Sequence, residues 1–155
     1  MEYKITEQSG AAVVALAGAI NEDAELNLQA LTKELAGKAK VVFNFANVKS
    51  INSLGVRAWV MFLRGLDDGR EIAFNECPPD VIMQINMIPS FLGRARVASF
   101  FTNYICENCD FTQKILIDTT ALKPKTLPQP QACPKCKAEM ETEELEEEYF
   151  AFLLR

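Results

Sequence analysis

Histidine is absent from this chain of 155 residues. Imidazole is the most common general base near neutral pH and the most common protein ligand for transition metals. Its absence excludes every Ser-His or Cys-His pair for nucleophilic catalysis and every metal site that uses imidazole. Much enzyme chemistry is excluded in this way, and we expect the chain not to be an enzyme.

Long apolar runs and dense clusters of basic residues are also missing. The longest apolar stretch, AAVVALAGAI at 11–20, is far shorter than the roughly 20 residues that span a bilayer, and MEYKITEQSG does not have the pattern of a signal peptide. The formal net charge is −5, and Lys and Arg form no stripe that could neutralise a phosphate backbone. We therefore expect a cytoplasmic protein that binds neither membranes nor nucleic acid.

Apolar residues make up 49% of the sequence, which is enough to form a hydrophobic core. Strand and helix patterns alternate along the first 100 residues and predict an α/β fold, with a mixed sheet covered by helices mainly on one side. The predicted strands are 3–10, 11–20, 40–48, 70–77 and 96–105. The predicted helices are 21–37, 53–66 and 78–89.

Four of the five cysteines form two Cys-x-x-Cys pairs, Cys106 with Cys109 and Cys133 with Cys136, and 23 residues (110–132) separate the pairs. This spacing is typical of four-cysteine zinc sites, in which four thiolates surround a structural ion and leave no open position for a substrate. Disulfides and a redox Cys-x-x-Cys motif are the alternatives, but the first is rare in the cytosol and the second needs no matching pair. We expect structural zinc.

The cysteine pairs lie in a region of different composition. A strand pattern follows the first pair and a Pro-rich loop precedes the second, as in a zinc ribbon. The acidic segment EELEEEYFAFLLR then predicts a terminal amphipathic helix that docks by its apolar face on the sheet or on a second copy of the chain. We therefore expect three parts, namely a domain at 1–100, a zinc ribbon at 101–140 and a helix at 141–155. Cys77 stands apart and is expected to be a buried apolar side chain.

Ser53 stands where a predicted strand gives way to the helix at 53–66. A serine at this point usually caps the helix, since its hydroxyl accepts a hydrogen bond from a free backbone N–H. The same free N–H groups and the helix dipole also favour a phosphate there. The local sequence is compatible with both interpretations.

The stretch VVFNFANVKSINSLGVRAWVMFL at 41–63, preceded by VVALAGAINEDAELNLQAL at 13–31, resembles the STAS domain of bacterial anti-sigma-factor antagonists. The resemblance covers about residues 1–100 and implies the order of strands and helices given above. In that family a serine at the start of the second helix is phosphorylated by a partner kinase of the anti-sigma type, and Ser53 falls on that position with Gly55 on the family's glycine. The resemblance therefore implies a phosphorylatable signalling protein that acts by partner switching.

Asn52 and Leu54 differ from the family pattern, which has an aspartate before the serine and a second hydroxyl residue after it. These two residues favour a second hypothesis, in which Ser53 is only a cap and the chain is a constitutive scaffold or assembly subunit that uses the zinc ribbon. A third hypothesis, a thiol redox enzyme that uses Cys77 or a Cys-x-x-Cys pair, is disfavoured because the paired spacing suits a metal and no imidazole base is present.

The helical projections also identify surfaces for a partner. The second predicted helix places Arg57, Met61 and Arg64 on the face opposite the core. The third is apolar nearly all round, because Met83 and Met87 lie outside its core stripe. The C-terminal module, a second copy of the chain in a homodimer, or another signalling protein would cover these residues.

Overall fold

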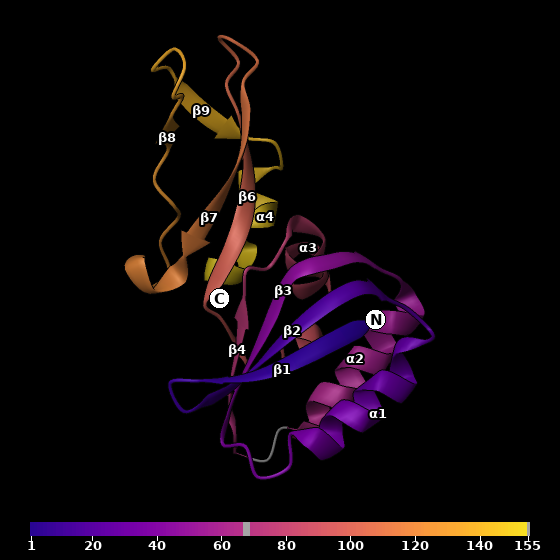
Figure 1. Ribbon diagram of the computed structural model, residues 1–155. Coiled ribbons are helices and arrows are strands. Elements are labelled where there is room, and N and C mark those ends of the chain that lie inside the picture. Colours follow the sequence, from indigo (N-terminus) through magenta and orange to yellow (C-terminus); the bar gives the residue numbers. More distant parts are fainter. Residues whose placement is uncertain (67–68, 155) are drawn as a thin grey trace.

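The computed structural model describes residues 1–66 and 69–154. A five-stranded sheet in the order β1-β2-β3-β4-β5 forms its first part (Figure 1). β1 and β2 are antiparallel, and the other neighbouring strands of this sheet are parallel. The strands are β1 (Glu2–Gln8), β2 (Ala11–Ile20), β3 (Lys40–Ile51), β4 (Glu71–Asn75) and β5 (Arg96–Val97).

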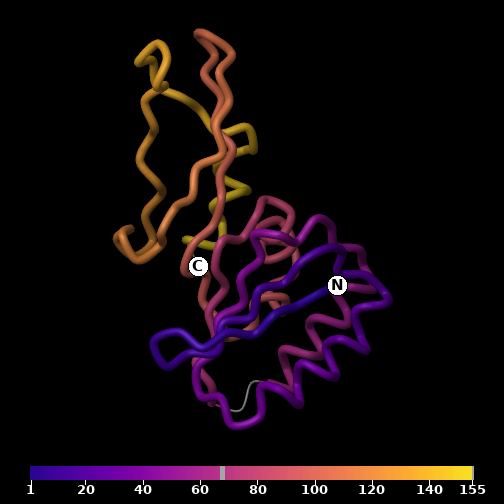
Figure 2. The backbone as a smooth tube through the Cα atoms, viewed as in Figure 1, coloured from indigo at the N-terminus to yellow at the C-terminus, as the bar shows by residue number. Residues whose placement is uncertain are grey.

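Two long helices lie side by side along one face of this sheet (Figures 1 and 2). They are α1 (Ala24–Glu34) and α2 (Ser53–Leu66), and α3 (Pro79–Met87) follows β4. The predicted fold class, an α/β fold with a mixed sheet and helices mainly on one side, is confirmed. No helix in the described part of the chain is long and apolar enough to cross a membrane.

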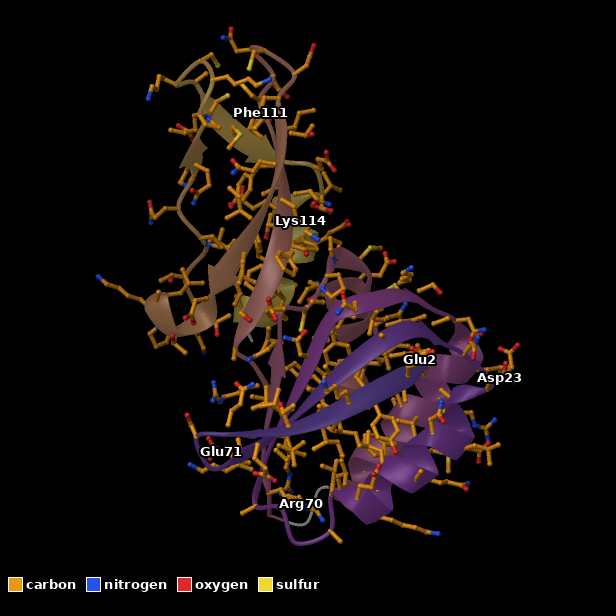
Figure 3. The ribbon with its side chains drawn as sticks, in the orientation of Figure 1. Glu2, Asp23, Arg70, Glu71, Phe111 and Lys114 are labelled. Atoms are coloured by element: carbon orange, nitrogen blue, oxygen red, sulfur yellow. The ribbon has the colours of Figure 1, made fainter. Side chains whose placement is uncertain are left out.

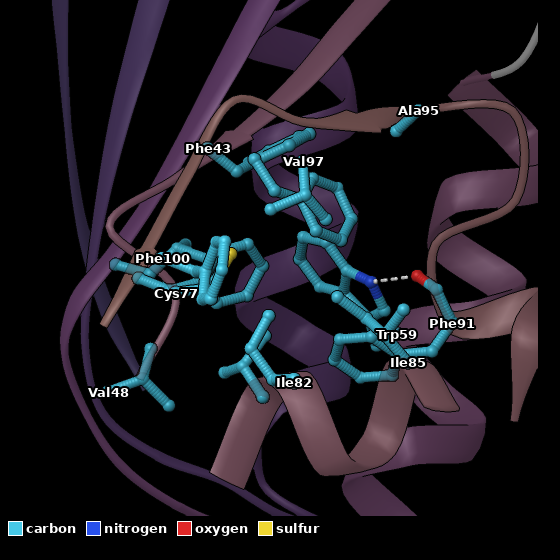
Figure 4. Packing of buried hydrophobic residues seen from close by; sticks show 14 of the residues in the cluster. Phe43, Val48, Trp59, Cys77, Ile82, Ile85, Phe91, Ala95, Val97 and Phe100 are labelled. Carbon is cyan, nitrogen blue, oxygen red and sulfur yellow. Dashed lines mark hydrogen bonds between the residues drawn. The ribbon is translucent and has the colours of Figure 1, made fainter. Parts of the chain in front are cut away.

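Aromatic side chains fill the space between the sheet and the helices. Trp59 of α2 is completely buried, and its ring contacts Phe43 and Phe45 of β3 with centroids 5.1 and 5.4 Å apart. The indole Nε1–H donates a hydrogen bond to the Phe91 carbonyl at 3.0 Å (Figure 4). This bond satisfies the one polar group of the indole inside an apolar core. The core therefore holds α2 in a fixed position against the sheet.

The helix faces differ in detail from the projections. Leu26 of α1 shares the helical spacing of Leu28 and Leu31 but is exposed, whereas those two residues are buried. On α3, Ile82 is fully buried although it lies next to the exposed Met83, and Ile88 lies beyond the end of the helix and is partly buried. These differences in burial have one cause. Packing against neighbouring elements widens or shifts the buried face of a helix, which sequence spacing predicts only approximately.

The predicted strand at 96–105 is divided between two sheets. Arg96–Val97 pairs with β4, whereas β6 (Ser99–Ile105) belongs to a four-stranded sheet in the order β7-β6-β9-β8. The Cys77 N–H donates to the Ser99 carbonyl at 3.1 Å, and the Phe101 N–H donates to the Cys77 carbonyl at 2.8 Å. These bonds join the two sheets through the backbone. The other strands are β7 (Thr112–Asp118), β8 (Gln131–Ala132) and β9 (Glu139–Thr142).

The single helix expected at 141–155 is instead the end of β9 and two short helical segments. These are α4 (Glu146–Tyr149) and the 3₁₀ helix η3 (Ala151–Leu154), while Arg155 lies outside the described residues. Tyr149 and Phe150 are buried, and the Tyr149 hydroxyl donates a hydrogen bond to the Phe101 carbonyl. The segment packs against β6 and α3, so Tyr149 and Phe150 face the rest of the same chain, whereas Leu145 and Leu154 are exposed.

Candidate functional site

Asn52, not Ser53, caps the N-terminus of α2. The Asn52 Oδ1 atom accepts a hydrogen bond from the Gly55 N–H at 2.8 Å, and the Asn52 carbonyl accepts the first helical bond from the Val56 N–H at 2.9 Å. This is the geometry of an N-cap residue. The expected cap role of Ser53 is therefore wrong by one position, although asparagine is as good a cap as serine and the sequence did contain the signal.

The Asn52 side chain also connects α2 to the loop before α1. Its Nδ2 donates a hydrogen bond to Glu22 Oε2 at 2.8 Å, and its backbone N–H donates to the Ile20 carbonyl at 3.1 Å. The Asn52 amide lowers the pKa of Glu22, because it stabilises the ionised carboxylate. The Asn52 amide can accept from Gly55 and donate to Glu22 at once, whereas an ionised aspartate here could not donate and would oppose the Glu22 charge.

Gly55 allows α2 to approach the end of β2. A Cβ atom at Gly55 would lie 1.9 Å from the Ile20 carbonyl oxygen and 2.8 Å from the Asn21 nitrogen. Both neighbours are backbone atoms, so a flexible side chain could not relieve the clash. Glycine is needed here for close packing between backbones.

Ser53 is the first residue of α2 and is exposed to solvent. Its hydroxyl has no hydrogen-bond partner within residues 1–66 and 69–154. Since Asn52 supplies the cap, the hydroxyl is not needed to hold the helix. It is therefore accessible beside the free N–H groups at the start of α2.

A groove of about 560 Å³ lies between α1 and α2, and Leu54, the residue after Ser53, is part of its lining. Leu54, Ala58 and Met61 contribute apolar surface from α2. Glu25 of α1 and Arg57 of α2 are charged residues of its lining. Leu54 and Met61 are 56% and 63% exposed, which is unusual for large apolar side chains that lie close together.

The five residues expected to contact a partner lie on two helices, α2 and α3. Arg57 and Met61 line the α1–α2 groove, whereas Arg64 lines a separate cavity of about 40 Å³. Met83 and Met87 lie on α3 and remain 47% and 64% exposed. The C-terminal segment packs against α3 through other contacts, including a hydrogen bond from the Asn86 side chain to the Tyr149 carbonyl at 2.9 Å.

The four paired cysteines converge at the far end of the second sheet. Their sulfur atoms all lie within 4.8 Å of one another, with Cys106 and Cys136 at 3.4 Å and Cys109 and Cys133 at 3.6 Å. Four thiolates around a tetrahedral zinc ion, with Zn–S bonds near 2.3 Å, would be separated by about 3.8 Å. The cluster could therefore hold a metal ion.

The two Cys-x-x-Cys turns share one backbone geometry. In the first, the Cys106 N–H donates to the Phe111 carbonyl at 2.7 Å, and Asp110 has a left-handed backbone with φ of 60°. In the second, the Cys133 N–H donates to the Ala138 carbonyl at 2.7 Å, and Lys137 has φ of 68°. Such turns direct backbone N–H groups toward the sulfurs, which suits thiolate ligands.

Hydrogen bonds give the sulfurs different affinities for protons. The Asn108 side chain and the Ala138 N–H lower the pKa of Cys136 to about 6. The Phe111 N–H acts in the same direction on Cys109, but burial and the neighbouring thiols outweigh it and raise that pKa. The Lys135 ammonium also forms a cation–π contact with the ring of Phe111, which is labelled in Figure 3, at 5.0 Å from the ring centre. The surroundings of Cys136 thus already favour the thiolate that a metal requires.

Cys77 is remote from this cluster in sequence and environment. Its side chain is fully buried, and burial raises the pKa of its thiol far above the ordinary value. A thiol in such surroundings stays protonated and is a poor nucleophile. The structure thus places Cys77 in the apolar core, where it joins the backbone contact between the two sheets.

Comparison with solved structures finds a similarity to the anti-sigma-factor antagonist SpoIIAA in its unphosphorylated form. The sequence identity is 14%, the TM-score is 0.47, and the match covers 61% of this chain and 86% of that one. At these values the likeness supports no conclusion about function. No protein-family model matches the chain, and no curated protein matches its sequence.

Proposed function

We propose that the chain is a cytoplasmic bacterial regulatory protein that works by protein–protein binding, in the manner of an anti-sigma-factor antagonist with a STAS-like domain. Phosphorylation of Ser53 changes its affinity for a partner, which is an anti-sigma-factor-type kinase or another signalling protein. No step of this function requires the chain to be an enzyme. The sequence resemblance at 13–31 and 41–63 supports the proposal.

The observation that carries the proposal is the position of Ser53. Ser53 is exposed, does not cap α2, and directly precedes Leu54, which lines the α1–α2 groove together with Met61. A phosphate there would add a charge of about −2 next to free helix N–H groups. It would also lie close to Glu22, whose carboxylate is already bound by Asn52. Repulsion between these charges would alter the entrance to the groove and thereby the affinity for a partner.

Phosphorylation is tested by intact-mass spectrometry after incubation with candidate anti-sigma-type kinases and ATP. We expect transfer of one phosphoryl group from ATP to the Ser53 oxygen, a gain of about 80 Da. Ser53→Ala should abolish the gain, and Ser50→Ala, a matched change of another exposed serine just before α2, should leave it intact. A gain that persists in Ser53→Ala, or no gain with any kinase encoded in the same genome, would contradict the switch.

We further propose that Cys106, Cys109, Cys133 and Cys136 hold a structural zinc ion. The sulfur separations and the all-thiolate donor set support Zn²⁺ over harder cations such as Mg²⁺. A fully coordinated ion would supply no catalysis. It would instead hold the two turns together. In this way it would give the proposed zinc ribbon at 101–140 a fixed shape.

A constitutive scaffold is the second candidate, and the two side-chain hydrogen bonds of Asn52 favour it. Because Asn52 already caps α2 and binds Glu22, the N-terminus is complete without a phosphate. A scaffold would bind its partner equally well as wild type, as Ser53→Ala and as Ser53→Asp. The switch instead predicts that Ser53→Asp changes partner affinity by about 5- to 100-fold while Ser53→Ala does not.

A further inference from the structure

One edge of the four-stranded sheet is open. β7 lies at the end of the order β7-β6-β9-β8, so β6 is its one neighbour among the described strands. The loop at 122–130 forms no hydrogen bond with β7 in the part of the chain that the structure describes. Such an edge presents N–H and C=O groups that another strand can bind. The outer edge of β7 is therefore able to pair with a second chain.

The hydrogen bonds of β6 show which backbone groups of β7 face this edge. Phe101 of β6 lies opposite Leu116 of β7. The N–H and the carbonyl of Phe101 bond to Cys77 and Tyr149, on the other side of β6. In an antiparallel ladder such a pair exchanges no hydrogen bonds, so the N–H and the carbonyl of Leu116 also point away from β6. Neither group has a hydrogen-bond partner in residues 1–66 and 69–154.

Lys114 and Asp118 lie two residues to either side of Leu116 and share its backbone orientation. The residues opposite them on β6, Asn103 and Ser99, also use their carbonyls on the far side of that strand. Because side chains alternate along a strand, Lys114, Leu116 and Asp118 lie on one face of β7. All three are exposed, and Leu116 is 46% exposed. The edge thus carries a positive, an apolar and a negative side chain in that order.

This order of side chains is self-complementary. If two copies of β7 pair antiparallel about a two-fold axis at Leu116, each Leu116 lies opposite its counterpart and each Lys114 lies opposite the partner's Asp118. The outward N–H and C=O groups of these residues then bond across the axis. An axis at Lys114 or at Asp118 places like charges opposite each other, and an axis at Ile115 places Lys114 opposite Leu116. Of these positions, the axis at Leu116 is the one that pairs opposite charges.

We propose that β7 pairs edge to edge with β7 of a second copy of this chain, with the two-fold axis at Leu116 and Lys114 bonded to the partner's Asp118. The Asp118 carboxylate can accept this bond, because its two hydrogen bonds from Thr120 both end on Oδ1. The Lys114 ammonium lies 4.4 Å from the centre of the Phe101 ring and forms no ion pair within residues 1–66 and 69–154. The pairing joins two four-stranded sheets into one and does not involve the α1–α2 groove.

The test measures self-association of the full-length protein by sedimentation velocity over a range of micromolar concentrations. Lys114→Glu and Asp118→Lys each place like charges opposite each other across the axis, whereas the two changes together restore opposite charges. The matched control is Lys49→Glu, which reverses the charge of an exposed lysine of β3 in the first sheet. Asp118→Lys also removes the side-chain cap of the 3₁₀ helix at 119–121, but the combined variant lacks the same cap. Recovery in the combined variant therefore reports the charge pair across the axis.

We expect a dimer with a Kd in the micromolar range. Each single reversal should weaken the dimer about tenfold, because the two-fold axis repeats every change. The combined variant should return to within about threefold of the wild-type Kd, and Lys49→Glu should change the Kd by less than about twofold. Circular dichroism and metal content should be the same in all variants.

A protein that stays monomeric at every concentration would overturn the proposal and leave the edge of β7 to a strand of another partner. A dimer that the single reversals do not weaken, or that the combined variant does not recover, would also overturn it.

Discussion

At the scale of single residues, Asn52 and Gly55 together determine where α2 begins. Asn52 supplies both the cap and the link to Glu22, and Gly55 lets the helix approach the Ile20 carbonyl. Local sequence could predict a helix start near here, because Asn and Ser are both strong caps. It could not decide between adjacent residues, since contacts with β2, which is distant in sequence, make that choice.

Two glycines of α2 should respond oppositely to replacement by alanine. Gly55→Ala places a Cβ 1.9 Å from a backbone oxygen, and we expect the free energy of unfolding to fall by about 3 kcal/mol. Gly65→Ala meets no atom within 4 Å, and we expect a gain of about 0.5 kcal/mol because alanine restricts the unfolded chain. Urea unfolding followed by fluorescence of the single tryptophan, Trp59, measures both. Equal effects in the two variants would contradict the close approach at Gly55.

At the scale of elements, local patterns predicted the helix at 53–66 and the order of strands and helices in the first sheet. They failed where an element's limit depends on a distant partner. The strand pattern at 96–105 is continuous, yet it is divided near Ala98 because β4 pairs with one part and β7 with the other. The terminal segment has helical periodicity, but its first residues, Glu141 and Thr142, belong to β9 and pair with β6.

The C-terminal segment should contribute to stability through its buried aromatic side chains. Phe150 is 1% exposed and its ring lies 6.0 Å from that of Phe100, so Phe150→Ala should lower the free energy of unfolding by about 3 kcal/mol. Leu145 is 69% exposed, and Leu145→Ala should change it by less than about 0.5 kcal/mol. Thermal unfolding of the two variants tests the difference. A Phe150→Ala protein as stable as Leu145→Ala would mean that the segment does not dock.

At the scale of the whole molecule, the two sheets share one continuous core. Trp59 of the first part and Phe100, Tyr149 and Cys133 of the second belong to the same cluster of buried residues. The cysteine spacing predicted the cluster of four sulfurs because a Cys-x-x-Cys turn is a local structure. The α1–α2 groove could not be predicted, since it forms only when two helices that are separate in sequence pack side by side.

The proposed zinc site predicts that loss of the metal affects one part of the molecule. The β8–β9 hairpin pairs at only two positions, Gln131 with Met140 and Ala132 with Glu139, and β9 meets β6 at only two more. So little pairing should not hold the hairpin once the proposed metal is lost, whereas the strands of the first sheet are paired over many residues. We expect about one zinc per chain by elemental analysis, lost in Cys133→Ser but retained in Cys77→Ser. Hydrogen exchange at 131–142 should then rise to rates near those of an unfolded chain in Cys133→Ser, while β2 and β3 stay protected. A metal-free Cys133→Ser protein whose hairpin remains protected would show that side-chain packing alone holds the second sheet.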